Sequence, residues 1–249
     1  MMKLNADFTR PAEVHEADQA WQSSPMPGVY RKPLDRIGHH LARATSIVRY
    51  DPQSVFSSHV HGGGEEFLVL DGVFQDENGD YPKGTYVRNP PQTQHSPRSE
   101  AGCTIFVKLW QCRADDKQHV VIDARGGMSP RFEDGDNMLI MPLYTDDEER
   151  VTLQTWRPET EIRLDALNGI ELLVLSGLFT YQGREFSANS WLRLPPGRDF
   201  FARTSEHTTQ VWVKQHHLSP TRIESELKRL ESWKLANKAK QVDDDANRR

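Results

Sequence analysis

The chain has 249 residues, with 31 lysines and arginines against 36 aspartates and glutamates, and a formal net charge of −5. The basic residues are interspersed with acidic ones and form no stripe, so we expect no nucleic-acid partner. No segment is long and apolar enough to cross a membrane, and Met1–Asp7 lacks the apolar core of a signal peptide, so we expect a cytoplasmic protein.

Residues 1–26 show no strong periodicity, and we treat them as an N-terminal segment. Residues 27–113 follow as the first of two units built from short, regularly spaced apolar runs with turn residues between them. Such runs are typical of strands in a β-sandwich or barrel. The length of the chain suits two units of this size.

The first unit carries a motif that can bind a metal ion, His59-Val-His-Gly-Gly-Gly-Glu65. His59 and His61 are two residues apart, so on a β-strand both rings point to the same face. The three glycines allow a tight turn that brings Glu65 back beside them at the start of the next strand. His95 follows the pair Pro90-Pro91, which marks a strand end from which a side chain can lean into a cavity. The sequence therefore predicts a site for one divalent metal ion with the ligands His59, His61, Glu65 and His95.

Two parts of this interpretation have alternatives. A His-x-His pair on a strand is often a solvated face, but here a glycine turn, a carboxylate and a later histidine accompany it. Glu65 and Glu66 point to opposite faces of their strand, so we choose Glu65 as the ligand and expect Glu66 to be solvated or salt-bridged. Strand alternation also makes Phe67, Val69 and Tyr86 candidates to line the site, although ordinary barrel core explains each of them more simply.

The chain contains an internal duplication with an offset of 105 or 106 residues. Residues present in both halves are interpreted as architecture, and residues present in one half are candidates for function. On this basis we expect Arg88 and Lys108 to be structural. The recurring features are Glu66–Phe74 as Glu171–Phe179, Arg88 as Arg193, Lys108 as Lys214, and Pro90-Pro91 as Pro195-Pro196.

The metal ligands do not recur in the second unit, residues 114–217. Arg163–Leu167 stands where the His-x-His pair would recur, and Phe200 stands where His95 would fall. At best Asp165 and Glu171 remain as carboxylates. We therefore expect a metal-free second barrel that covers the first, forms a dimer surface or roofs the site, and we expect the protein to be a homodimer.

Residues 218–249 read as a helix followed by a tail. Ser219-Pro220 is a helix start, and apolar residues follow at helical spacing at Ile223, Leu227, Leu230 and Trp233. We expect this helix to pack against the barrel, with a partner helix as the alternative. The segment from Val242 to Arg249 is highly charged, and we expect it to be disordered.

The sequence around the motif resembles the ChrR-like cupins, which include the C-terminal cupin domain of ChrR-type anti-sigma factors and have acetylacetone-cleaving dioxygenases as relatives. The resemblance covers about residues 27–111 and rests on the histidine motif, Gly72, Gly84–Pro91 and His95. It implies an all-β fold of two tandem cupin (jelly-roll) barrels with a C-terminal α-helix. Cupins usually have a glycine in the Pro-x-Gly-x-x-His turn, where this chain has Gln92, so either this turn differs or Gln92 reaches the site.

Two classes of function follow from a metal with open coordination positions. Our primary hypothesis is a non-haem metal-dependent oxygenase that acts on a small molecule, with iron or manganese as the metal. The dioxygenase relatives hold iron with three histidines, so the additional Glu65 is a difference from them. The alternative is a zinc-containing sensor or small-molecule-binding regulatory cupin of ChrR type.

ChrR-type proteins bind their sigma factor through a separate N-terminal helical domain, which has its own zinc site of histidine and cysteine. This chain has no cysteine before Cys103, and His15 is alone in the first 38 residues. We therefore expect a stand-alone cupin with a small-molecule ligand and no sigma factor partner. A purely structural protein is the weakest reading, since buried histidines and a carboxylate are costly without a metal or partner.

Overall fold

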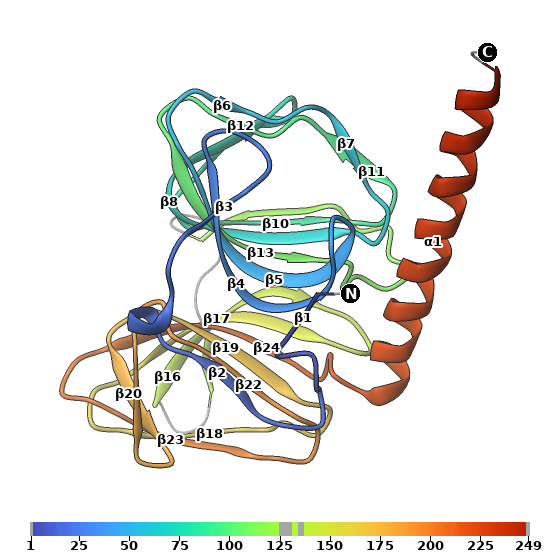
Figure 1. Ribbon diagram of the computed structural model, residues 1–249. Helices are drawn as coiled ribbons and strands as arrows, with labels where there is room; N and C mark the ends of the chain where they lie inside the picture. Colours follow the sequence, from blue (N-terminus) through green and yellow to red (C-terminus); the bar gives the residue numbers. More distant parts are fainter. Residues whose placement is uncertain (1, 125–130, 134–136, 248–249) are drawn as a thin grey trace.

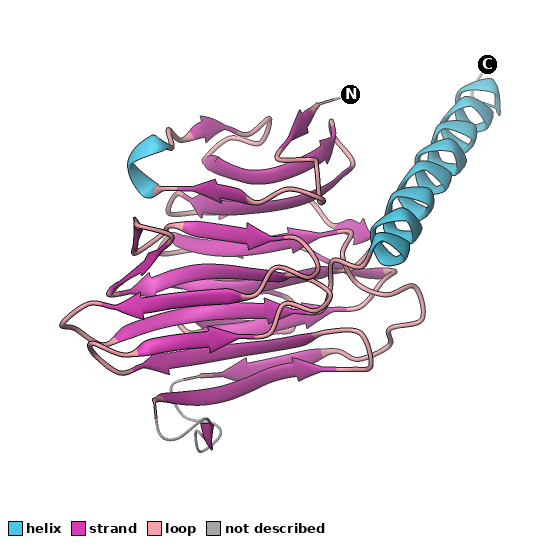
Figure 2. Cartoon of the chain, turned by 90° about the horizontal axis from the view of Figure 1, so that it is seen from below, coloured by secondary structure: helices cyan, strands magenta, loops and turns pink. Residues whose placement is uncertain are grey.

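The computed structural model describes residues 2–124, 131–133 and 137–247. Within these residues the protein consists of two β-barrels and one long helix, α1 (Pro220–Asn247), as the sequence predicts. Figure 1 shows the two barrels stacked on each other, with α1 lying alongside both. Figure 2 shows the strands in layers and the helix standing at one edge of them.

The first barrel is built from one large antiparallel sheet and several short strands. In spatial order the large sheet contains β1 (Lys3–Leu4), β4 (Val29–Gly38), β5 (Ala42–Tyr50), β13 (Cys103–Leu109), β8 (Glu65–Asp76), β10 (Thr85–Asn89) and β14 (Val120–Asp123). The short strands are β3 (Gln22–Ser23), β6 (Ser54–Val55), β7 (His59–His61), β9 (Gly79–Pro82), β11 (Thr93–His95) and β12 (Arg98–Ser99).

The second barrel repeats this topology. Its large sheet contains, in order, β15 (Arg131–Glu133), β16 (Met138–Thr145), β17 (Arg150–Trp156), β24 (Thr209–Gln215), β19 (Ile170–Ser176), β22 (Trp191–Leu194) and β2 (Ala12–Val14). The opposite sheet contains β18 (Glu161–Leu164), β23 (Phe200–Thr204), β20 (Leu178–Tyr181) and β21 (Arg184–Ser187). Strands β16, β17, β24, β19 and β22 therefore take the places of β4, β5, β13, β8 and β10.

Each large sheet ends on a strand from outside the duplicated unit. Strand β14 pairs with β10, and β2 pairs with β22 at the corresponding edge. The first sheet thus extends beyond residue 113, where we placed the domain boundary. The N-terminal segment adds β1 and β3 to the first barrel and β2 to the second, with a short 3-10 helix (Glu16–Asp18) between β2 and β3. These additions satisfy backbone groups that an open sheet edge would leave unpaired.

The large sheets are buried on both faces, because one face lines a barrel and the other packs on the second barrel. The interface core includes Phe106 and Trp212, corresponding residues of the two halves, whose ring centroids lie 4.8 Å apart. The first barrel's interior includes Phe67, Phe74 and Tyr81, and the second barrel's interior includes Trp156, Phe179, Phe186 and Phe200.

Buried ion pairs connect the barrels in a reciprocal way. Lys108 of the first barrel contacts Glu171 of the second at 2.6 Å, and Lys214 of the second contacts Glu66 of the first at 2.6 Å. Glu66 is therefore salt-bridged rather than solvated. Arg88 also binds Glu66, at 3.0 Å. These contacts support the structural role that the duplication predicts for Arg88 and Lys108.

Helix α1 begins where the sequence predicts. The Ser219 hydroxyl accepts a hydrogen bond from the Arg222 backbone N–H at 3.3 Å, and Pro220 is the first helical residue. The helix continues to Asn247, into the segment from Val242 for which we expected disorder; the last two residues lie outside the described part. Residues 221–247 contain no glycine or proline that would end the helix. No helix in the described residues is long and apolar enough to cross a membrane.

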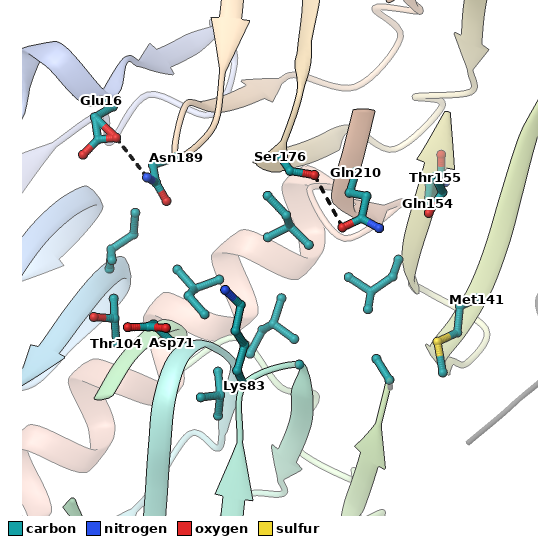
Figure 3. A pocket seen from close by; sticks show the side chains of 18 of the residues that line it. Glu16, Asp71, Lys83, Thr104, Met141, Gln154, Thr155, Ser176, Asn189 and Gln210 are labelled. Carbon is teal, nitrogen blue, oxygen red and sulfur yellow. Dashed lines mark hydrogen bonds between the residues drawn. The ribbon is translucent and has the colours of Figure 1, made fainter. Parts of the chain in front are cut away.

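A cavity of about 790 Å³ lies between the barrels. Side chains of both halves line it, including Leu68, Leu70, Leu153 and Leu175, and Figure 3 shows Lys83 pointing into it. The four predicted metal ligands do not line this cavity. They lie elsewhere in the first barrel, where β7, β8 and β11 meet.

Candidate metal centre

The strand pair β7–β11 brings the three histidines together. The strands are antiparallel, and His95 lies directly opposite His59, while Thr93 lies opposite His61. Strand alternation puts His59 and His61 on one face, and Val60 between them is exposed on the other. His61 and His95 are buried, and His59 is half-buried. The cluster predicted from sequence separations of 2 and 34 residues is thus assembled by one register.

The glycine turn adds Glu65 to this cluster. The Gly64 N–H donates to the His61 carbonyl at 3.1 Å, and Gly64 has φ +78°, a conformation that glycine adopts without strain. Glu65 then opens β8 and is buried. The Asn89 amide donates to Glu65 Oε2 at 3.2 Å. The carboxylate is therefore held on the inner face of the barrel, beside the imidazoles.

The distances between these side chains suit a shared metal ion. His61 Nε2 and His95 Nε2 lie 2.8 Å apart, and Glu65 Oε2 lies 3.5 Å and 3.3 Å from them. The ligand atoms of the three histidines all lie within 4.8 Å of one another. Two atoms bound at about 2.1 Å to one metal are roughly 3.0 Å apart in octahedral and roughly 3.4 Å apart in tetrahedral geometry. The spacing around His61, His95 and Glu65 therefore fits one ion.

In His59 and His95, hydrogen bonds to Nδ1 leave Nε2 as the nitrogen that faces the site. The Nδ1 atom of His59 lies 3.0 Å from the Ser57 carbonyl oxygen, which can only accept, so Nδ1 carries the proton. The Nδ1 atom of His95 lies 3.1 Å from Asp76 Oδ2, which likewise makes it the donor. Both rings then present an unprotonated Nε2 to the site, the tautomer that a metal requires.

The protonation states also favour a cation. Burial lowers the pKa of His61 to about 4, so this ring is neutral near pH 7. Burial alone would raise the pKa of Glu65, but the neighbouring His61 and His95 lower it overall, so the carboxylate is ionised. Burial opposes protonation of His95, but the hydrogen bond to Asp76 and the charge of Glu65 raise its pKa. An ionised Glu65 carboxylate beside the neutral His61 ring is suited to hold a divalent ion.

Three residues that support the ligands were missed in the sequence. Asp76 accepts hydrogen bonds from His95 and from the Tyr81 hydroxyl at 3.1 Å, and Asn89 binds Glu65. A carboxylate behind a metal-binding histidine fixes its ring orientation and its tautomer. The sequence offers no distinct signal for Asp76 and Asn89, because Asp76 opens a polar turn and Asn89 follows Arg88 at the end of its strand.

The predicted lining residues divide into two groups. Phe67 and Val69 belong to the interior core of the first barrel, on the same face of β8 as Glu65. Tyr86 lies opposite Leu68 and faces the second barrel, so it does not line the metal site. Gln92 has φ +73°, which explains the glycine usual there, and its amide donates to the Gly62 carbonyl at 3.3 Å. The side chain of Gln92 therefore holds the glycine turn.

The corresponding part of the second barrel has another character. Phe200 is fully buried among aromatic rings, with its centroid 5.5 Å from that of Phe179. Asp165 is exposed, and Glu171 faces the interface and binds Lys108. Glu171 is thus the counterpart of Glu66, while Ile170 takes the place of Glu65. In the described residues, the cluster that could hold a metal ion is that of His59, His61 and His95.

Comparison with known proteins identifies the first barrel. Residues 9–113 match the sequence model of the ChrR Cupin-like domain. No curated protein matches the chain.

Solved structures extend the likeness to both barrels. A putative dioxygenase from Nostoc punctiforme is 15% identical, with 85% of this chain and 84% of that chain covered and a TM-score of 0.66. A bacterial pirin from Escherichia coli, in complex with nickel(II), is 11% identical, with coverage of 83% and 99% and a TM-score of 0.62. An oxalate decarboxylase variant from Bacillus subtilis is 12% identical, with coverage of 84% and 78% and a TM-score of 0.55. At these identities the likeness shows the fold alone, so the protein has the two-barrel cupin fold, and its residues 9–113 belong to the ChrR cupin-like family.

Proposed function

We propose that the protein is a bicupin that binds one divalent metal ion in its first barrel and acts as an oxygenase-type enzyme on a small molecule. The observation that carries this proposal is the convergence of His61 Nε2, His95 Nε2 and Glu65 Oε2 within 3.5 Å of one another. His59 completes the set from the more exposed side. Burying these nitrogen and oxygen atoms together costs free energy unless a cation lies between them.

The surroundings of the site suit chemistry on a small molecule. Bound iron or manganese would supply Lewis-acid and electron-transfer chemistry. His59 is the least buried ligand, so a substrate would approach on its side, next to Phe56, whose ring centroid lies 5.7 Å from that of His59. On the inner side, Phe67 and Phe74 exclude water. The putative dioxygenase and the oxalate decarboxylase variant support an enzymatic role for a cupin of this fold.

Elemental analysis of natively purified protein, without chelators or added metal, tests the proposal. About one iron or manganese per chain supports it and justifies screening for substrate-dependent O₂ uptake. His61→Ala should lower the metal content sharply, and Glu65→Gln should lower it less, because three histidines remain. The matched control is Asp165→Ala, an exposed carboxylate of the second barrel, which should leave the content unchanged. A full equivalent of metal in His61→Ala would show that the ligand assignment is wrong.

The second candidate function is a zinc-containing sensor or regulatory cupin that binds a small molecule. The match of residues 9–113 to the ChrR Cupin-like domain favours it. One zinc per chain, with no O₂ uptake across a substrate screen, would support this function. We propose that such a cupin acts without a sigma factor; co-purification of a stoichiometric sigma factor from native cells would contradict that part.

A further inference from the structure

We propose that Trp233 of α1 is a positioning residue for the metal site, which it controls by packing on the glycine turn between His61 and Glu65. Together with Trp110 it forms a clamp of two indole rings on Gly62 and Gly63. This inference rests on the proposed metal-binding function and adds the C-terminal helix to it.

The two glycines make room for the two rings. A Cβ atom on Gly62 would lie 2.7 Å from the indole of Trp233, and one on Gly63 would lie 2.3 Å from the indole of Trp110. Both distances are shorter than any contact that a real Cβ makes, so each ring sits directly on bare backbone. The rings themselves meet edge to face, with centroids 5.9 Å apart.

The duplication separates the clamp from the shared architecture. Gly64 and Gly169 correspond, with φ +78° and +86°, and in each a Cβ would clash at 2.6 Å, with Cys112 and Leu218 respectively. Gly64 is therefore required by the cupin topology in both barrels. The clamped positions differ from it: Gly62 and Gly63 correspond to Leu167 and Asn168.

The second barrel shows what this turn looks like without a clamp. Leu167 is 66% exposed, whereas Gly62 is buried under Trp233. Indole rings thus cover the glycines of the turn between His61 and Glu65, the two proposed metal ligands. The corresponding turn of the second barrel has the bulky, exposed Leu167 instead. Features present in only one half of the duplication are candidates for function, so we assign the clamp to the metal site.

Helix α1 is anchored firmly enough to hold Trp233 in place. Arg229 donates to the Cys112 carbonyl at 2.6 Å, and Arg222 donates to the Gln111 carbonyl at 2.8 Å. Glu226 binds the buried Arg43 at 2.7 Å. Trp233 follows Arg229 by four residues and so lies on the same face of the helix. Figure 1 shows α1 running along both barrels and past β7 and β11.

The backbone beneath Trp110 supports the turn from the other side. The Trp110 N–H donates to the Gly64 carbonyl at 3.1 Å, and the Cys112 N–H donates to the Gly63 carbonyl at 3.3 Å. Trp110 has φ +65° and the corresponding His216 has φ +69°, so this backbone conformation belongs to the architecture that both barrels share. The turn is therefore held both by backbone hydrogen bonds from Trp110 and Cys112 and by the two indole rings that pack on Gly62 and Gly63. Loosening it should move His61 relative to Glu65.

Metal titrations of the full chain test the clamp. Trp233→Ala should weaken binding of Zn²⁺ and Co²⁺ by about tenfold or more, as measured by competition with a chelator, and should alter the visible absorption of bound Co²⁺. Trp233→Phe should restore most of both properties. The matched control is Leu235→Ala on the same helix, whose side chain is 70% exposed and which should change neither.

A double-variant cycle separates positioning from loss of stability. Gly62→Ala should weaken metal binding because its methyl group displaces the indole, and the same change should have little further effect in a Trp233→Ala background. If the parent chain binds metal and Trp233→Ala keeps the same metal affinity and the same Co²⁺ absorption spectrum, the clamp proposal is wrong but the proposed function stands. A parent chain that takes up neither metal would overturn the proposed function and the clamp together.

Discussion

At the residue scale, the candidate ligands depend on groups that lie outside the ligand set. Asp76 lies behind His95 and accepts three hydrogen bonds, from His95 Nδ1, the Tyr81 hydroxyl and the Asn78 backbone. Burial opposes ionisation of Asp76, but these hydrogen bonds lower its pKa overall, so it is a charged acceptor. It therefore fixes the direction in which the His95 lone pair points.

Replacing Asp76 should weaken the metal site without removing a ligand. Asp76→Asn should reduce metal affinity by about tenfold and Asp76→Ala by up to about a hundredfold, because the His95 ring loses its charged acceptor. Dissociation constants from chelator competition measure this effect. Asp71→Asn, an exposed carboxylate on the same strand, is the control. Equal affinities in Asp76→Ala and the parent would show that His95 is oriented by other contacts.

Protons and metal should compete mainly at His95. Its pKa is raised above the ordinary 6.5, while that of His61 is lowered to about 4. A raised histidine pKa means that the proton binds more tightly, so metal affinity should fall as the pH drops through and below that pKa. We expect roughly tenfold loss per pH unit below it, with no contribution from His61 until about pH 4. An affinity that stays flat between pH 8 and 5 would contradict this assignment.

Three of the four ligand candidates, His59, His61 and Glu65, could be predicted because the relevant constraints are short-range. His95 was predicted from the proline pair before it, and only the fold brings it to the others. A His-x-His pair shares a face in any strand, and a glycine turn returns Glu65 to it whatever the rest of the fold does. Asp76 and Asn89 could not be predicted in this way. Asn89 meets Glu65 because the two residues are paired across β10 and β8. That register depends on how the whole sheet assembles.

At the element scale, strand β10 shows where sequence alternation fails. Its five residues are all buried, since one face lines the first barrel and the other packs on the second. With both faces buried, the burial expected from the sequence is the same on each side and cannot tell which face is inside. The pairing of Tyr86 with Leu68 decides it and turns Tyr86 toward the second barrel. The prediction that Tyr86 lines the site is wrong for this reason.

The orientation of Tyr86 gives a direct test of the register. Its hydroxyl is buried with no hydrogen-bond partner among the described residues, so Tyr86→Phe should leave stability unchanged or raise it by up to about 1 kcal/mol. Metal affinity should not change. Tyr81→Phe is the matched comparison, because its hydroxyl donates to Asp76 and its loss should weaken metal binding. Thermal unfolding and chelator competition measure both variants, and a loss of metal from Tyr86→Phe would contradict the register.

At the scale of the whole molecule, the two barrels form one unit through exchanged charges. Lys108 lies directly opposite Glu66 within its own sheet, and Lys214 lies opposite Glu171. Each lysine nevertheless makes its 2.6 Å contact with the glutamate of the other barrel. The duplication could be recognised in the sequence because corresponding residues keep their spacing. The exchange of partners could not, since the local pattern is the same whether the pairs form within or between barrels.

Breaking one of these pairs should destabilise both barrels. Lys214 contacts Glu66 and also Glu149, at 2.9 Å, and all three are almost completely buried. Lys214→Ala should lower the free energy of unfolding by about 3–5 kcal/mol, because two carboxylates would lose a buried partner. Arg88 and Arg222 remain beside them, which favours the lower end of that range.

Denaturant unfolding followed by tryptophan fluorescence measures this loss. Lys228→Ala is the matched control, since its pair with Glu224 is exposed to solvent and should contribute little to stability. The double variant with Lys214 replaced by methionine and Glu66 by leucine should recover part of the lost free energy of unfolding. It removes both charges of the pair, so Glu66 is no longer buried without its lysine. If instead the second barrel unfolds alone in Lys214→Ala, while the first keeps its parent midpoint, the barrels are independent and the exchanged pairs do not join them.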